Sequence, residues 1–204
     1  MVHGAALEKR SSRKRSVGSN PTLSARQSMN IDYADLLSRD PAVKYGCARR
    51  LLGLAREDPA QLYPRLDFFI GLLEGENRIL KWTAIDIVGE LARVDTAGAI
   101  DGLVGRLSEL LSAGNMITAN HAIAALANIA RAKPEHQVRI TGELLKVEHY
   151  SYDTDECRNI AIGAAILAIG SYLTSYRKNR LQPILSGGRE RTLETLPGRR
   201  RSSS

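Results

Sequence analysis

The sequence has few cysteines, few aromatic residues and no long apolar run. Only two of its 204 residues are cysteine, Cys47 and Cys157, and 5% are aromatic. Two distant cysteines cannot form the framework of a disulfide-rich secreted domain. The longest uncharged apolar stretch, residues 160–173, is shorter than the ~20 residues that span a bilayer. We therefore expect a cytoplasmic protein without a membrane span, with both cysteines packed in its core.

The middle of the chain also lacks net charge. Of the formal charge of +7, residues 1–28 supply +5 (six basic, one acidic) and residues 183–204 supply +3 (five basic, two acidic). Residues 29–182 then hold 18 basic and 19 acidic side chains, a net charge of −1. The two ends are rich in Ser, Arg and Gly, a composition typical of disordered tails. Any grip on nucleic-acid phosphates is therefore assigned to these tails alone.

The first tail has a second interpretation. Gly18-Ser19-Asn20-Pro21 is what the T-arm sequence GGUUCGAAUCC of a transfer RNA gene gives when it is read as codons. The hypothesis that follows is that residues 1–28 translate such a gene and that the protein starts at Met29.

The middle segment shows helical periodicity, no strand-like alternation, and one helix start that occurs four times. Each start has a short polar side chain able to cap the exposed N–H groups of a helix. At spacings of 37, 38 and 39 residues, these caps are Asp40, Asn77, Asn115 and Thr154. Seven positions after each cap is a small residue that would let a neighbouring helix approach closely: Cys47, Ala84, Ala122 and Ala161. Partner helices are expected between these starts, over residues 59–74, 96–112 and 133–148.

The helix starts follow a pattern of a cap, then Val or Leu, then Lys or Arg, then two further residues and a small residue. This pattern, in a unit of 37–39 residues, resembles the HEAT repeat. The likeness covers about residues 31–176, three and a half to four units, and the third unit departs from it at Thr118-Ala119. The resemblance implies an all-α fold, a right-handed α-solenoid of about four helical hairpins over residues 29–182. In such solenoids the second helices line a concave, protein-binding surface, which implies a scaffold or adaptor and no particular chemistry.

Motifs for catalysis are lacking, with no Gly-rich phosphate loop and no nucleophile elbow. Residues 148–157 combine carboxylates, an imidazole and a thiol that could hold a metal. However, Asp155 and Glu156 stand at a helix start, where negative charge is favoured. We therefore expect no enzyme activity, cofactor or metal, and keep a metal-dependent activity at residues 149–157 as the weaker alternative. His121 stands alone among alanines and is expected to be half-buried and hydrogen-bonded.

The candidate partner-binding residues come from one column of the repeat and from the positions one turn after it. At ~100° per residue, Tyr45 lies about 200° around its helix from Cys47, so its column faces away from the small residues. Tyr and Trp are the residue types that dominate interfaces. The predicted partner-binding residues are Tyr45, Arg49, Trp82, Asp86, Asn120 and Asn159. The alternative for Trp82 is packing in the seam between two repeats.

The last predicted helix carries no charged side chain from residue 159 to residue 176. A helix that is apolar nearly all round is expected to be buried, and a solenoid normally ends in a capping repeat with a polar outer face. Two alternatives follow: the 160–173 face packs against a second copy in a homodimer, or a C-terminal cap is missing from the sequence.

Overall fold

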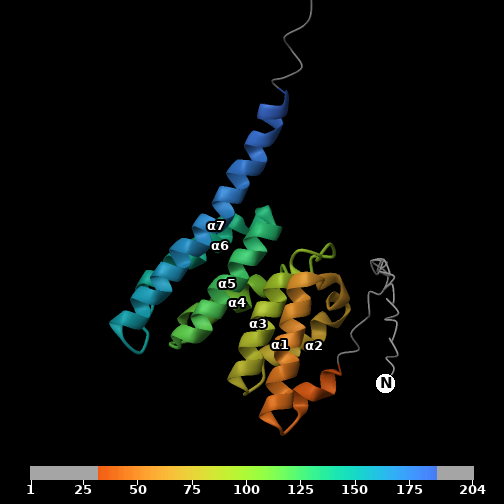
Figure 1. Cartoon of the computed structure of the whole chain (residues 1–204). Coiled ribbons are helices and arrows are strands. Elements are labelled where there is room, and N and C mark those ends of the chain that lie inside the picture. Colours follow the sequence, from red (N-terminus) through yellow and green to blue (C-terminus); the bar gives the residue numbers. More distant parts are fainter. Residues whose placement is uncertain (1–31, 188–204) are drawn as a thin grey trace, which may run out of the picture. The chain divides into compact units, whose positions relative to one another are not determined.

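Long and short helices alternate along the chain (Figure 1). The computed structural model describes residues 32–187, and their side chains as far as residue 173. The predicted first tail and residues 188–204 lie outside the described residues. The long helices are α1 (Pro41–Glu57), α3 (Arg78–Leu91), α5 (Met116–Ala132) and α7 (Asp155–Gly187). The short helices are α2 (Leu66–Leu73), α4 (Leu103–Glu109) and α6 (Gln137–Leu145). Residues 32–187 contain no strand, so the all-α prediction is confirmed for this part of the chain.

Short 3₁₀ turns flank these helices. They are η1 (Tyr33–Leu37), η2 (Pro59–Gln61), η3 (Tyr63–Arg65), η4 (Leu110–Ser112), η5 (Pro134–His136) and η6 (Lys146–His149).

All four predicted caps stand at the start of a long helix. Asp40 accepts a hydrogen bond of 2.8 Å from the backbone N–H two residues on. Asn77 accepts from the N–H groups two and three residues on, at 3.1 and 3.2 Å. Asn115 and Thr154 each accept from the N–H three residues on, at 3.0 and 3.2 Å. The spacing of the caps therefore sets where each long helix begins.

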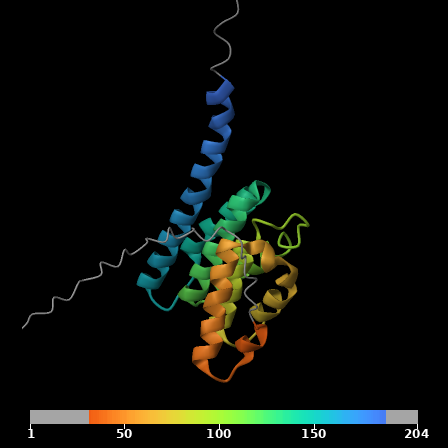
Figure 2. The ribbon, with the colours of Figure 1, turned by 45° about the vertical axis from the view of Figure 1, so that its right-hand side comes forward.

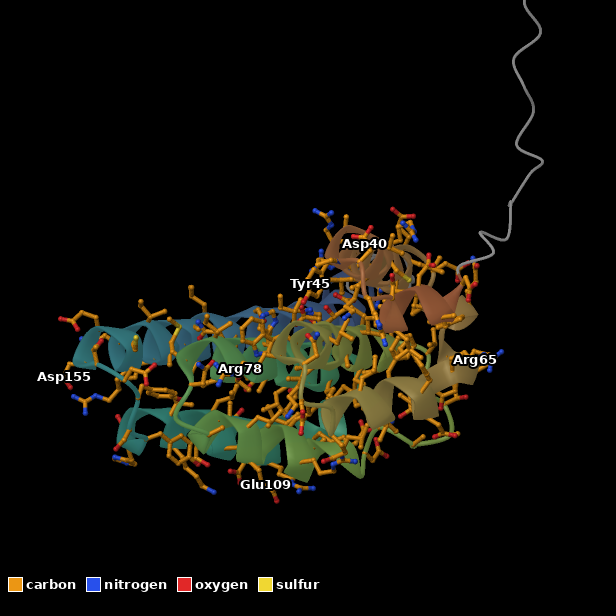
Figure 3. The ribbon with its side chains drawn as sticks, turned by 90° about the horizontal axis from the view of Figure 1, so that it is seen from below. Asp40, Tyr45, Arg65, Arg78, Glu109 and Asp155 are labelled. Carbon is orange, nitrogen blue, oxygen red and sulfur yellow. The ribbon has the colours of Figure 1, made fainter. Side chains whose placement is uncertain are left out.

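The long helices pack side by side in the order α1, α3, α5, α7, and the short helices form a second layer against them. Figure 3 separates the two layers, with Glu109 of α4 on one side and Asp40, Tyr45 and Asp155 on the other. The predicted small residues, Cys47, Ala84, Ala122 and Ala161, are all fully buried. The closest approach is at Gly89, where an added Cβ would lie 2.7 Å from Cα of Ala125.

The core fills the space between the layers. Phe69, Leu107 and Ile140 from the short helices are fully buried against the apolar faces of α3 and α5. Cys47 lies in this core, as predicted, whereas Cys157 is only half-buried near the start of α7.

The predicted partner helices are shorter than expected. Residues 59–65 form two 3₁₀ turns, because Pro59 and Pro64 have no N–H to donate and so open new helical turns instead of extending one. Residues 96–102 form turns, with Gly98 at a φ of 75°. At the other end, the helix α7 extends to Gly187, five residues beyond the predicted boundary at residue 182.

Helix α7 is not buried all round in the single chain. One side is buried through Ala161, Ala165, Ala168 and Tyr172, while Ile166 on another side is 63% exposed. Figures 1 and 2 show that the C-terminal part of α7 continues past α5 and α6. The charge-free composition of this helix is therefore not explained by contacts within the described chain.

Candidate interaction face

The predicted partner-binding residues lie on the side of the long helices that faces away from the core, which we call the outer face. Tyr45, Trp82 and Asn120 are half-buried there, and Arg49 and Asn159 are exposed. The structure brings Trp82 of α3 together with residues of α5, and it places Tyr45 on α1 and Asn159 on α7. The predicted column is therefore spread over four helices and does not form one pocket.

Trp82 lies in the seam between α3 and α5. Its indole Nε1 donates a hydrogen bond of 2.9 Å to Oγ1 of Thr118. Its ring stacks on the ring of His121, with the two centroids 5.6 Å apart and the planes 11° from parallel. These contacts match the seam-packing alternative for Trp82, so this side chain has a structural role even if it also touches a partner.

Asp86 completes the same cluster. Its Oδ1 lies 2.8 Å from Nδ1 of His121, and its side chain is largely shielded from solvent. The prediction that His121 is half-buried and hydrogen-bonded is confirmed. Four side chains from two helices thus make a small polar and aromatic patch at the centre of the outer face, held by contacts between helices and not by loops.

Asn120 borders this patch on α5. Its Nδ2 lies 3.0 Å from Sδ of Met116, and its Oδ1 is buried and accepts no hydrogen bond from the described residues. Burying a carbonyl oxygen without a hydrogen-bond donor costs free energy, so this arrangement of Asn120 lowers the stability of the fold.

Sequence reasoning missed a row of exposed aliphatic side chains near the starts of the four long helices, which we call the outer row. Its members are Val43, Ile79, Ile117 and Ile160. Ile79 is 42% exposed and Ile117 is 44% exposed, and they stand one turn before Trp82 and Asn120. The signal was present, because Ile79 and Ile117 each stand two positions after a cap. Only Ile79 and Ile117 hold equivalent positions of the repeat, because the second residues after the other two caps are Ala42 and Glu156.

A ladder of arginines at the C-terminal ends of the long helices was also missed. Arg56, Arg93 and Arg131 recur at spacings of 37 and 38 residues. Nη2 of Arg93 donates to the backbone carbonyls of Ala55 and Arg56, at 2.9 and 2.8 Å, and pairs with Glu90 at 3.2 Å. Because Arg93 supplies donors to carbonyls at the end of α1, its first role is to satisfy a helix terminus. A cavity of about 390 Å³ beside it is lined by Glu90, Arg93, Asn128, Arg131 and Ala132.

A buried ionic cluster joins the turn after α3 to the turn after α5. Nζ of Lys133 lies 2.8 Å from Oδ2 of Asp95 and 2.5 Å from Oδ1 of Asp101. The hydroxyl of Tyr63 donates to Oδ1 of Asp95. Burial by itself raises the pKa of Asp95, but the hydrogen bonds from Lys133, Tyr63 and two backbone N–H groups outweigh it and lower the pKa to about 2. Lys133 and Asp95 are shielded from solvent while Asp101 is 40% exposed, and the contacts of Lys133 with both aspartates hold the two turns together.

The polar segment 148–157, the weaker metal candidate, is arranged as a helix start. Glu148 pairs with His149, and Asp155 pairs with Arg158 on the first turn of α7. Within the part of the chain that the structure describes, no three His, Cys, Asp or Glu side chains gather as a metal site requires.

Comparison with known proteins adds no relative: no protein-family model and no curated protein matches the chain. Among residues 32–187, no helix combines the length and the apolar character that crossing a membrane requires.

Proposed function

We propose that this chain is a HEAT-like, right-handed α-solenoid that acts as a cytoplasmic, non-enzymatic scaffold and binds a partner protein on its outer face. The capped helices at intervals of 37–39 residues and the two layers of helices support the solenoid. In the HEAT family one helix of each hairpin lines the binding surface, and we assign that role to the long helices. The predicted partner-binding residues all lie on these helices.

The observation that carries the proposal is the outer row. Single exposed apolar side chains are normal, whereas several on one face of neighbouring helices favour an interaction site. Ile79 and Ile117 hold equivalent positions of successive units, next to the aromatic ring of Trp82 and the polar side chain of Asn120. Because α3 and α5 pack side by side, a partner segment that crosses both helices can contact both side chains.

The test is affinity capture of partners from native lysate with the full chain, followed by mass spectrometry. The decisive variant is Ile79→Asp with Ile117→Asp. Both side chains are over 40% exposed and stand in the first turn of a helix, where a negative charge is favoured, so we expect the fold to be kept. Trp82 is a poor choice for this test because its replacement would also disturb the seam between α3 and α5. We expect a partner in stoichiometric amounts with the wild-type chain, and its loss with the variant.

The matched control is Val138→Asp, which places the same charge on α6 at a side chain that is 87% exposed in the other layer. The control variant should capture the same partner as the wild-type chain. A partner that survives the double substitution while circular dichroism shows an unchanged helix content contradicts the proposal.

A second candidate function is nucleic-acid binding through the basic tails. The observation that favours it is the charge of +5 on residues 1–28 and +3 on residues 183–204, against −1 in between. In that case the helical layers would act as a neutral spacer between two arms that grip phosphates.

A further inference from the structure

The exposed side of α7 is the side that the following helix covers in each preceding unit. In α3 the residues Ile85, Gly89 and Ala92 are buried, and Gly89 faces Ala125 of α5. In α5 the equivalent residues Ile123, Ala127 and Ala130 are buried as well. The equivalent residues of α7 are Ile162, Ile166 and Ile169. Here Ile162 and Ile169 are half-buried and Ile166 is exposed, because nothing in residues 32–187 follows α7.

This side forms an apolar groove with α6 and η6, which we call the open end. The groove has a volume of about 170 Å³, and Glu148 is the single charged residue among the eight that line it. Leu145 on α6 borders it and is exposed, as is Leu173 further along α7. The open end therefore has the composition of a surface between two helical units and not that of a solvated face.

The other end of the stack is closed. The turn η1 covers α1 there, with Leu36 fully buried and Arg50 paired with Asp35 at 3.3 Å. Tyr33 of η1 packs edge-on against Phe68, with ring centroids 5.5 Å apart. The two ends therefore present different surfaces, and Leu37 of η1 is 73% exposed at this one. Head-to-tail contacts between the two ends would extend the stack beyond a dimer, which distinguishes them from a two-fold pair.

We propose that the open end binds the open end of a second copy, in a two-fold homodimer that is independent of the partner on the outer face. An isologous interface places the same patch on both sides. The chain has no charged residue from 159 to 176, so pairing this side of α7 with itself brings no like charges together. A second copy necessarily presents the same apolar surface, so no other protein with a matching surface has to be assumed.

The area available to such a dimer is small. With ~1.5 Å of rise per residue and a width of ~10 Å, α7 up to Leu173 presents about 300 Å² in projection, and the residues of α6 and η6 that line the groove add to it. Each partner of a standard interface buries ~600–1,000 Å². We therefore expect a weak dimer whose formation depends on protein concentration.

Sedimentation velocity of the full chain tests this inference. The wild-type chain, 22.3 kDa as a monomer, should change from monomer to dimer over a range of about 1–100 µM. The variants Ile166→Glu and, separately, Leu145→Glu should raise the dissociation constant at least tenfold, because each places a charge in the groove. Val138→Asp, exposed on α6 but outside the groove, should leave it unchanged.

Three outcomes overturn the inference: a monomer throughout this range, which would leave the groove to a different protein, a dimer that both groove variants leave intact, or assembly that continues beyond the dimer. Circular dichroism and urea unfolding of each variant show whether it is folded. Because Ile166 and Leu145 are both more than half exposed, neither substitution is expected to unfold the chain. Partner capture by the outer face should persist in these variants, which separates this interface from the proposed function.

Discussion

At the scale of single residues, the ion pair between Lys133 and Asp95 is a contact whose loss should be costly, because it is buried. Both side chains are almost completely shielded from solvent. Paired charges tolerate this environment only when their remaining hydrogen-bonding groups are satisfied, and here Tyr63 and two backbone N–H groups complete the shell of Asp95. The pair bridges two turns that are 38 residues apart in sequence, so it acts as a clamp between successive units.

Replacing Lys133 by Met should destabilise the protein by about 3–5 kcal/mol, because the carboxylate of Asp95 would stay buried without its partner. Urea unfolding at neutral pH measures this change. The control is Lys146→Met, which removes an exposed pair with Glu143 and should cost less than about 1 kcal/mol. If the two substitutions lowered the free energy of unfolding equally, the buried cluster would contribute no more to stability than the exposed pair.

The same cluster predicts how stability depends on pH. The pKa of Asp95 is lowered from 3.8 to about 2 in the folded chain, so its contribution is complete above pH ~4 and is lost as the pH falls towards 2. The difference between the two pKa values corresponds to about 2 kcal/mol. Urea unfolding between pH 2 and 5 should show this loss in the wild-type chain and much less of it in Lys133→Met. An equal slope in both proteins would contradict the assignment to Asp95.

At the scale of helices, the close approach of α3 to α5 sets the spacing of the long-helix layer. At Gly89 an added Cβ would lie 2.7 Å from Cα of Ala125, which is backbone and cannot move aside alone. The layer therefore depends on a glycine inside a helix, a position where glycine is otherwise unfavourable. The loss in helix propensity is offset by the contact it permits.

Gly89→Ala should destabilise the protein by about 1–3 kcal/mol, because the new methyl group forces α3 and α5 apart. Gly53→Ala is the matched control, since an added Cβ at Gly53 in α1 meets nothing within 4 Å. That substitution should stabilise the chain by about 0.5–1 kcal/mol through helix propensity alone. Thermal unfolding of both variants measures whether each change in stability is a loss or a gain. Stabilisation by Gly89→Ala would contradict the prediction, because it would show that α3 and α5 separate readily.

The sequence predicts the starts and the buried sides of the long helices because both depend on local signals that repeat. Caps such as Asn115 and small residues such as Ala122 need no knowledge of distant contacts. The length of the turn after α3, which extends to residue 102, could not be predicted, because Asp95 organises it together with Lys133, which is far away in sequence. The pairing of Asp86 with His121 also joins two helices, and no spacing within one helix indicates it.

The exposed side of α7 shows a further limit of the sequence. A charge-free segment indicates burial, but composition alone does not tell which neighbour supplies it. In the structure one side of α7 packs within the chain, while Ile166 remains exposed. The repeat register identifies that side as a surface for another unit, and this step required the buried state of Ile123 and Ile85 in the preceding helices.

At the scale of the whole molecule, charge is separated from the helical layers. Residues 29–182 have a net charge of −1, and the two predicted tails together carry +8. Because long-range attraction to phosphates follows the location of net charge, the layers contribute little to it. The molecule thus offers two independent means of binding: apolar surfaces on the helices, which are insensitive to salt, and basic segments at the ends, which are sensitive to it.

This separation predicts where any nucleic-acid affinity resides. Binding of the full chain to a short duplex DNA should weaken as salt rises, with a slope of about −0.9 in log K against log salt for each phosphate contacted. A variant with Gln at positions 13–15 and 199–201, which removes six positive charges, should bind more weakly and with a shallower slope. The same variant should dimerise and capture its protein partner like the wild-type chain, because neither surface includes these residues. An unchanged slope would show that the DNA contacts lie on the helical layers. Because the middle of the chain has almost no net charge, those contacts would then require a local basic patch such as the arginine ladder.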